Sequence, residues 1–211
     1  MTILEELSSS IGDRTQAANR VVAEKVRADP ALLSDIADGL SSANVKLVGD
    51  CAEIFTMTAE VQPGTVAAYV PRLIPLLGSK NTRVRWESTH TLALVARHAP
   101  EALAPILPSL TSAIGRDTSV IVRDYSILAL GEYAATGTTA ARAVFPHLVD
   151  ALKVWEGDHA ALALEGLAKA AITDQSLVHP VIEIARQYQD HQKAKVKQVA
   201  RATLRKLGQK P

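Results

Sequence analysis

Few residues of this 211-residue sequence have the types and spacing that catalysis or metal binding requires. A catalytic thiol needs a base beside it, but the single cysteine, Cys51, lies in a segment whose small residues are typical of helix packing. Six histidines are present, and none belongs to an HExxH zinc motif or precedes a glutamate. Phosphate-binding glycine motifs are also absent from the sequence. We therefore expect no catalytic residue, no metal ligand and no cofactor, and a protein that is not an enzyme.

A second group of residues suits recognition. Tryptophan and tyrosine are frequent anchors of protein interfaces, and aromatic residues make up only 4% of this chain. Trp86 and His90 are four residues apart, so a helix places them on one face. We predict a binding surface with Trp86, Tyr125 and His90 as the anchor and Asp124 and His159 as a polar rim. The alternative is that Trp86 packs between helices and that the polar residues only solvate its edge.

Basic residues are concentrated near the C-terminus. Lys+Arg and Asp+Glu number 23 and 22, but residues 186–211 contain eight bases, including Lys210, and one acid. The candidate basic patch consists of Lys193, Lys197, Arg201 and Arg205. Such a segment either contacts an acidic partner or nucleic acid, or forms the polar cap that ends a stack of repeats.

The elements that carry these residues are predicted to be helices. Apolar residues make up 47% of the chain, alanine and leucine are frequent, and no sustained strand-like alternation occurs. A β-branched residue followed by a base recurs before a helical segment at four places, which are Val45-Lys46, Val84-Arg85, Val122-Arg123 and Val196-Lys197. A second helix is expected before each marked one, at 31–40, 70–79, 107–115, 145–155 and 179–189, with proline near its start. The pattern predicts about five helix pairs of roughly 35–39 residues each.

This pattern resembles the HEAT-repeat (armadillo-like) α-solenoid family, in which a proline near the first helix precedes an Asn/Asp-x-x-Val-Arg/Lys lead into the second. Asn81, Val84 and Arg85 carry it most completely. The resemblance implies an all-α, right-handed superhelix of about five helix pairs with a partial N-terminal unit. We expect a single domain over 1–211, with a cap at 1–29, repeats at 30–185 and a basic segment at 186–211 that completes the last repeat.

In this family the second helices line the concave face, where partners bind. Aligning the second helices puts one position of each in a column, which reads Leu47, Trp86, Asp124, His159 and Gln198. The bases at the repeated position, Lys46, Arg85 and Arg123, could hold phosphate, but the family pattern favours pairing with acids along the array. The unit near residue 157 has Asp158 in place of the base, so we expect this link between units to be interrupted there.

The resemblance implies a non-enzymatic scaffold or adaptor that binds a protein partner on the concave face. One alternative is a nucleic-acid-binding protein similar to HEAT-like DNA glycosylases; another is a HEAT-type lyase or enzyme accessory subunit. The residues outside 186–211 carry a net negative charge, which opposes DNA binding. The different charges of the two ends would permit head-to-tail self-association. Because the sequence shows no signal peptide and no apolar run long enough to span a membrane, we expect a cytoplasmic protein without membrane contact.

Overall fold

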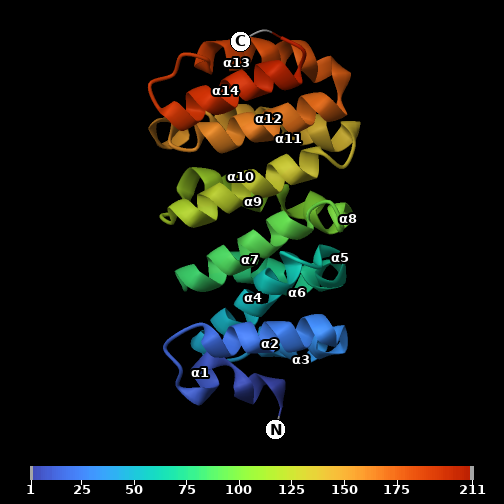
Figure 1. Ribbon diagram of the computed structural model, residues 1–211, viewed down its shortest axis with the longest axis vertical. Coiled ribbons are helices and arrows are strands. Elements are labelled where there is room, and N and C mark those ends of the chain that lie inside the picture. The colour runs from blue at the N-terminus through green and yellow to red at the C-terminus, as the bar shows by residue number, and fades with distance from the viewer. Residues whose placement is uncertain (1, 210–211) are drawn as a thin grey trace. The chain divides into compact units, whose positions relative to one another are not determined.

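The computed structural model describes residues 2–209, which form helices and turns without any β-strand (Figure 1). The chain divides into two compact units, residues 1–102 and 103–211, which are described separately below. The single-domain organisation stays a prediction. Between residues 2 and 209, no helix has the length and apolar character needed to span a membrane.

The first unit contains three long helices that correspond to second helices of repeats. They are α2 (Ala17–Ala28), α4 (Val45–Ala59) and α7 (Thr82–Val95). Helix α2 packs against α4, and α4 packs against α7. Two asparagines cap the first turns of α4 and α7. Asn44 accepts a hydrogen bond from the Lys46 amide, and Asn81 accepts one from the Val84 amide. The predicted cap contains α2, preceded by η1 (Ile3–Glu6) and α1 (Ser8–Ile11).

Prolines divide the first helices of the repeats into short segments. The prediction of one helix over 70–79 is wrong: this part of the chain contains α5 (Pro63–Val66), η3 (Ala67–Tyr69), α6 (Val70–Leu73) and η4 (Ile74–Gly78). Pro71 and Pro75 each occupy the first turn of a new segment, where the missing N–H costs no hydrogen bond. The first helix of the preceding pair consists of η2 (Pro30–Leu32) and α3 (Leu33–Gly39).

The second unit continues the alternation. Its second helices are α10 (Val120–Ala134), α12 (Ala160–Thr173) and α14 (Ala194–Lys206). The helices that precede them are α9 (Leu107–Arg116), α11 (Thr138–Ala151) and α13 (Val178–Tyr188), with 3-10 turns η5 (Ala104–Ile106), η6 (Val154–Gly157) and η7 (Gln175–Leu177). Helix α8 (Pro100–Leu103) lies at the boundary between the units. Helix α12 packs against both α10 and α14.

One predicted helix of the second unit has different bounds. The sequence predicts a helix over 145–155 that begins near Pro146, but α11 starts at Thr138 and Pro146 lies inside it. The helix ends at Ala151, and the chain then enters the left-handed region at Trp155 and Glu156, with φ of 51° and 55°. Both residues belong to a turn before α12, so the prediction that Trp155 ends a helix is wrong.

Small residues allow the second helices to approach closely. Four buried alanines lie on these helices, and they are Ala93, Ala129, Ala168 and Ala200. Two glycines meet where α10 crosses α12, because a Cβ atom added to Gly131 would be 3.0 Å from the Cα atom of Gly166. The backbones of α10 and α12 therefore approach closely at Gly131 and Gly166, about two helical turns beyond Asp124 along α10.

Candidate binding surfaces

The second unit brings Asp124 and His159 into direct contact. Asp124 lies in the first turns of α10, and His159 occupies the N-cap position of α12. The His159 Nδ1 atom is 2.6 Å from Asp124 Oδ1, and Arg123 Nε donates a hydrogen bond to His159 Nε2 at 2.9 Å. The imidazole is buried, only 2% exposed, and both of its ring nitrogens have partners inside the protein. The expectation that His159 forms an exposed rim is therefore wrong; it supports Asp124 from beneath.

Arg123 connects this pair to a turn that the sequence analysis missed. The arginine is 5% exposed and donates a hydrogen bond from Nη1 to the backbone carbonyl of Asp117 at 2.8 Å. Its guanidinium carbon lies 3.9 Å from the centre of the Trp155 ring, a cation–π arrangement. Trp155 also donates from Nε1 to the Ile114 carbonyl at 2.9 Å. The turn sequence Trp155-Glu156-Gly157 was the available signal, but assigning Trp155 to a helix concealed it.

Arg85, at the equivalent position of α7, makes a similar contact. Its Nη1 atom donates hydrogen bonds to the carbonyls of Ser79 and Lys80, at 2.8 and 3.3 Å. Arg85 and Arg123 thus each hold the loop that precedes their own helix. Side chains used in this way have fewer N–H groups left for a phosphate ligand.

A groove of about 330 Å³ opens beside the Asp124–His159 pair. It is lined by Ile121, Asp124, Tyr125, Leu128 and Leu162, which come from α10 and α12. The Asp124 side chain is 38% exposed, so its carboxylate faces solvent on one side and His159 on the other. The structure therefore brings together two of the predicted binding residues, Asp124 and Tyr125, with three aliphatic side chains.

Trp86 and His90 belong to α7 in the first unit. Trp86 is half-buried and donates from Nε1 to Glu87 Oε1 at 2.7 Å. His90 is also half-buried, and burial lowers its pKa to about 4, so the imidazole is neutral at pH 7. A single surface made of all five predicted residues stays a prediction, because the other three lie in the second unit.

A buried polar network crosses the three long helices of the first unit. Asn19 of α2 donates from Nδ2 to Asp50 Oδ1 at 3.0 Å and to Glu53 Oε2 at 2.6 Å, both on α4. Arg83 of α7 donates from Nη2 to the same two oxygens, at 2.9 and 2.7 Å. Burial alone would raise the pKa of Asp50, but hydrogen bonds from Ser9, Asn19 and Arg83 outweigh it and lower that pKa. The network keeps the Asp50 carboxylate ionised and holds the helices in register.

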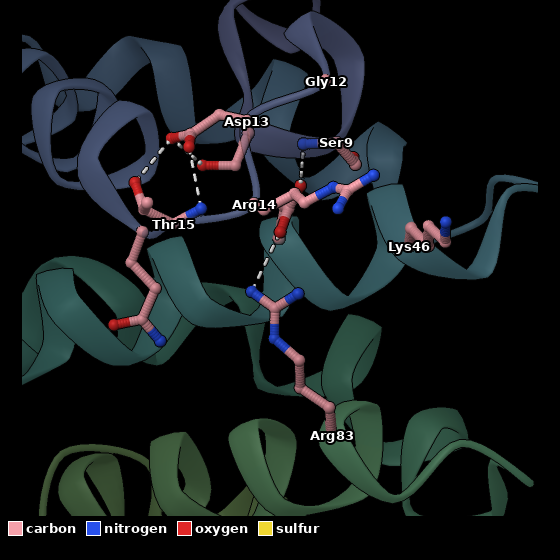
Figure 2. A pocket seen from close by; sticks show the side chains of 10 residues that line it. Ser9, Gly12, Asp13, Arg14, Thr15, Lys46 and Arg83 are labelled. Atoms are coloured by element: carbon pink, nitrogen blue, oxygen red, sulfur yellow. Dashed lines mark hydrogen bonds and ion pairs between the residues drawn. The ribbon is translucent and has the colours of Figure 1, made fainter.

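A polar cleft of about 740 Å³ lies over this network (Figure 2). Ten residues line it, and they are Ser8, Ser9, Gly12, Asp13, Arg14, Thr15, Gln16, Lys46, Asp50 and Arg83. Figure 2 shows Arg14 and Lys46 on the same side of the cleft, with Arg83 reaching toward them from α7. Sequence analysis considered only Lys46 here, because nothing local predicts that the loop at Gly12–Gln16 lies beside α4 and α7.

The basic segment is partly neutralised by its own neighbours. Lys193 Nζ lies 2.6 Å from Asp158 Oδ1, and Arg201 Nη2 lies 3.0 Å from Asp190 Oδ1. The expected interruption at Asp158 is therefore wrong, because this acid links to the next repeat through Lys193, and that contact lowers its pKa. Lys197 and Arg205 form no ion pair with another residue of the range 2–209. Lys210 lies outside the described residues.

In the part of the chain that the structure describes, no group of three or more His, Cys, Asp or Glu side chains could hold a metal ion.

No family model and no curated protein matches the sequence. Solved structures do match. A designed armadillo repeat protein in complex with the peptide (KR)4 has a TM-score of 0.75 and 17% identity, over 97% of this chain and 98% of that one.

Two further structures are similar over nearly the whole chain. A computationally designed armadillo repeat protein for modular peptide recognition has a TM-score of 0.70 and 16% identity, with 97% of this chain and 98% of that one covered. An engineered protein has a TM-score of 0.71 and 19% identity, with coverage of 98% and 95%. At these identities the likeness concerns the fold. The predicted architecture is thereby confirmed: this chain has the all-α fold of the armadillo/HEAT-like repeat solenoids.

Proposed function

We propose that this protein is a non-enzymatic interaction scaffold that binds an extended segment of a protein partner on the surface formed by its second helices. The contact would be made at the groove lined by Ile121, Asp124, Tyr125, Leu128 and Leu162. The observation that carries the proposal is the combination of this apolar groove with a carboxylate at its edge that is held in place by His159. Aromatic and aliphatic groups supply buried area, and a fixed charge supplies selectivity.

The chemistry of the groove favours a peptide that places a basic side chain next to an aliphatic one. Asp124 Oδ1 is occupied by His159, whereas Oδ2 accepts no hydrogen bond from any residue between 2 and 209. A lysine or arginine of the partner could therefore donate to Oδ2 while its neighbour covers Leu128 and Leu162. One of the similar designed proteins is itself in complex with a basic peptide, (KR)4.

The experiment is fluorescence polarisation with two labelled peptides, (KR)4 and (KL)4, at fixed ionic strength. Asp124→Asn is the informative variant, since the amide oxygen can still accept from His159 Nδ1 while the charge is lost. A hydrogen bond to a charged group is worth about 1.5–3 kcal/mol, so the Kd should rise roughly 10-fold or more. Asp150→Asn makes the same charge change on α11, at an exposed position, and should leave the Kd unchanged.

A second variant tests the apolar part. Leu162→Glu introduces a charge into the groove and should weaken binding of (KL)4 more than binding of (KR)4, because only (KL)4 loses an aliphatic contact there. An effect of equal size on the two peptides would show that the aliphatic wall takes no part. Equal affinities for Asp124→Asn and Asp150→Asn would sink the proposal. The cytoplasmic location and head-to-tail self-association stay predictions.

Nucleic-acid binding by the basic segment has less support. Lys193 and Arg201 form ion pairs with Asp158 and Asp190. The other two bases of the predicted patch, Lys197 and Arg205, have no ion pair inside the described range. Two phosphate contacts predict an affinity for single-stranded DNA that falls only weakly with salt. A steep salt dependence would restore this alternative.

A further inference from the structure

We propose that the polar cleft of the first unit binds a phosphate monoester through Arg14, Lys46 and Arg83. This inference is independent of the groove beside Asp124, which lies in the other unit. The proposal rests on the hydrogen-bonding groups of the cleft. Its acidic acceptors already have partners within the protein, whereas two of its three cations, Arg14 and Lys46, have none among the described residues.

The acids of the cleft are occupied by internal donors. Asp13 Oδ1 accepts from the Thr15 amide at 2.7 Å, and Asp13 Oδ2 accepts from the Thr15 hydroxyl at 3.0 Å and the Ala18 amide at 3.3 Å. These contacts lower the pKa of Asp13 and hold the loop in a tight turn. Asp50 Oδ2 accepts from the Ser9 amide at 2.7 Å, while Oδ1 accepts from Asn19 and Arg83. A carboxylate has about four lone-pair sites, so little acceptor capacity remains for a cationic ligand.

The cations present the opposite situation. Arg14 and Lys46 are exposed, and neither forms a hydrogen bond through its side chain or an ion pair within the described part of the chain. Arg83 uses Nη2 for Asp50 and Glu53, and its side chain remains 33% exposed. Guanidinium and ammonium groups carry five and three N–H donors. The cleft therefore offers an excess of charged donors, which is what an oxyanion requires.

Three separate segments bring these donors to one place. Gly12, with φ of 74°, ends α1 in the left-handed conformation. The chain turns there, and Arg14, two residues later, lines the cleft. Lys46 is in the first turn of α4, which Asn44 fixes by its cap. Gly49, one turn on, leaves room for Arg83, whose Nη1 atom would lie 3.4 Å from a Cβ atom at that position. The site is thus built from a cap loop and two repeats.

The two cations without an ion pair, Arg14 and Lys46, favour a phosphate monoester over a phosphate diester as the ligand. A phosphate monoester carries about −1.5 to −2 charges at pH 7, which matches the two cations without an ion pair, Arg14 and Lys46. The cleft volume of about 740 Å³ is far larger than one phosphate, so the phosphate is presented by a larger molecule. A phosphorylated serine or threonine of a protein and a free phosphorylated metabolite share this chemistry.

The test is a titration of the ¹⁵N-labelled full chain, followed by amide NMR, with sodium phosphate, with dimethyl phosphate and with a phosphoserine peptide at constant ionic strength. Amides of the Gly12–Gln16 loop and of Lys46 should shift saturably with phosphate and with the phosphopeptide. Saturation at lower concentration by the phosphopeptide than by phosphate identifies a protein-borne source, and the reverse identifies a small molecule. Dimethyl phosphate, a diester with a single charge, should bind at least about 10-fold more weakly.

Matched double variants complete the test. The double variant Arg14→Gln/Lys46→Gln should weaken phosphate binding at least about 10-fold, whereas Lys197→Gln/Arg205→Gln, with the same change of net charge, should not. Both pairs are at solvent-accessible positions, and unchanged helical circular dichroism verifies folding. Asp124→Asn should keep phosphate binding, so failure of the groove proposal and failure of this one are distinguishable. Equal responses of the wild type and Arg14→Gln/Lys46→Gln, or equal binding of phosphate and dimethyl phosphate, would overturn the inference.

Discussion

His159 contacts Asp124 through Nδ1 at 2.6 Å while its other ring nitrogen faces Arg123 Nε at 2.9 Å. Arginine can only donate hydrogen bonds, so Nε2 of His159 must be the acceptor and Nδ1 must carry the proton. The buried imidazole of His159 therefore connects the buried guanidinium of Arg123 to the partly exposed carboxylate of Asp124. These contacts between two repeats hold the Asp124 carboxylate in one position at the edge of the groove.

The first prediction concerns this tautomer. Long-range ¹H–¹⁵N spectra at pH 7 should show His159 as a neutral imidazole protonated at Nδ1. Replacement by leucine should destabilise the protein by about 1–3 kcal/mol, because Arg123 Nε and Asp124 Oδ1 would lose their buried partner. His147→Leu, at a half-buried position on α11, serves as the control and should change the free energy of unfolding by less than about 0.5 kcal/mol. A proton on Nε2 would contradict the assigned hydrogen bonds.

A second prediction concerns the left-handed turn before α12. Glu156 has φ of 55° and follows Trp155 at 51°, and this conformation costs an ordinary residue about 1–2 kcal/mol, which asparagine tolerates better. Glu156→Asn should therefore raise the free energy of unfolding by about 0.5–1 kcal/mol in urea titrations. Glu156→Gln removes the same charge but keeps the strain, so it should have little effect. Equal effects of the two substitutions would show that charge, not conformation, matters at this position.

Much of the fold could be predicted from the sequence because its determinants are local. Asn44 and Asn81 cap the helices that their types predict, and the alternation of helices follows the spacing of small and apolar residues. The bounds of the first helices were less predictable. Whether Pro146 begins a helix or lies within one depends on the residues before it, and Gly137 with Thr138 starts α11 eight residues earlier.

The candidate sites depend on contacts between repeats, which a single sequence does not display. The partners of His159 lie 35 and 36 residues away, and its burial follows from them. Similarly, Arg14 and Arg83 share a cleft only because the cap loop folds onto α4. Asp124 and Tyr125 could be proposed from their residue types and their place on the second helices. Trp155 could not, because its contacts depend on a left-handed backbone turn that the residue types did not predict.

A third prediction uses the pH dependence of stability. Glu87 is buried, and burial raises its pKa, with Glu53 adding to the effect, while hydrogen bonds from Trp86 and Thr56 oppose it. The folded state then holds a proton that the unfolded state releases above its pKa of about 4.3. Stability from this group is present below that value and declines as the pH rises through the folded pKa.

The variant Glu87→Gln removes this dependence and keeps the geometry, because the amide can accept from Trp86 Nε1 and donate to the Thr56 hydroxyl. It should be more stable than the wild type at pH 7, and the difference should shrink as the pH falls toward about 4.3. Urea unfolding at several pH values measures this. A difference that stays constant from about pH 4.5 to about pH 8 would contradict a raised pKa of Glu87.

The fourth prediction addresses the crossing of α10 and α12. A Cβ atom at Gly166 would lie 2.8 Å from Leu148 Cδ2 and 3.3 Å from Gly131 Cα. Leu148 is fully buried, so its Cδ2 atom would have to shift among packed neighbours, and the Gly131 backbone cannot yield without separating the helices. Alanine normally favours a helix over glycine by about 1 kcal/mol, but overpacking costs about 1–3 kcal/mol. Gly166→Ala should therefore lower the free energy of unfolding on balance.

Gly115 of α9 provides the matched control, because a Cβ atom there would have no neighbour within 4 Å. Gly115→Ala gains helix propensity without a clash and should raise the free energy of unfolding by up to about 1 kcal/mol. Urea titrations of the two variants should thus shift in opposite directions. If Gly166→Ala also stabilises the protein, the helices can separate at low cost, and the close approach of Gly131 to Gly166 does not limit how α10 and α12 pack.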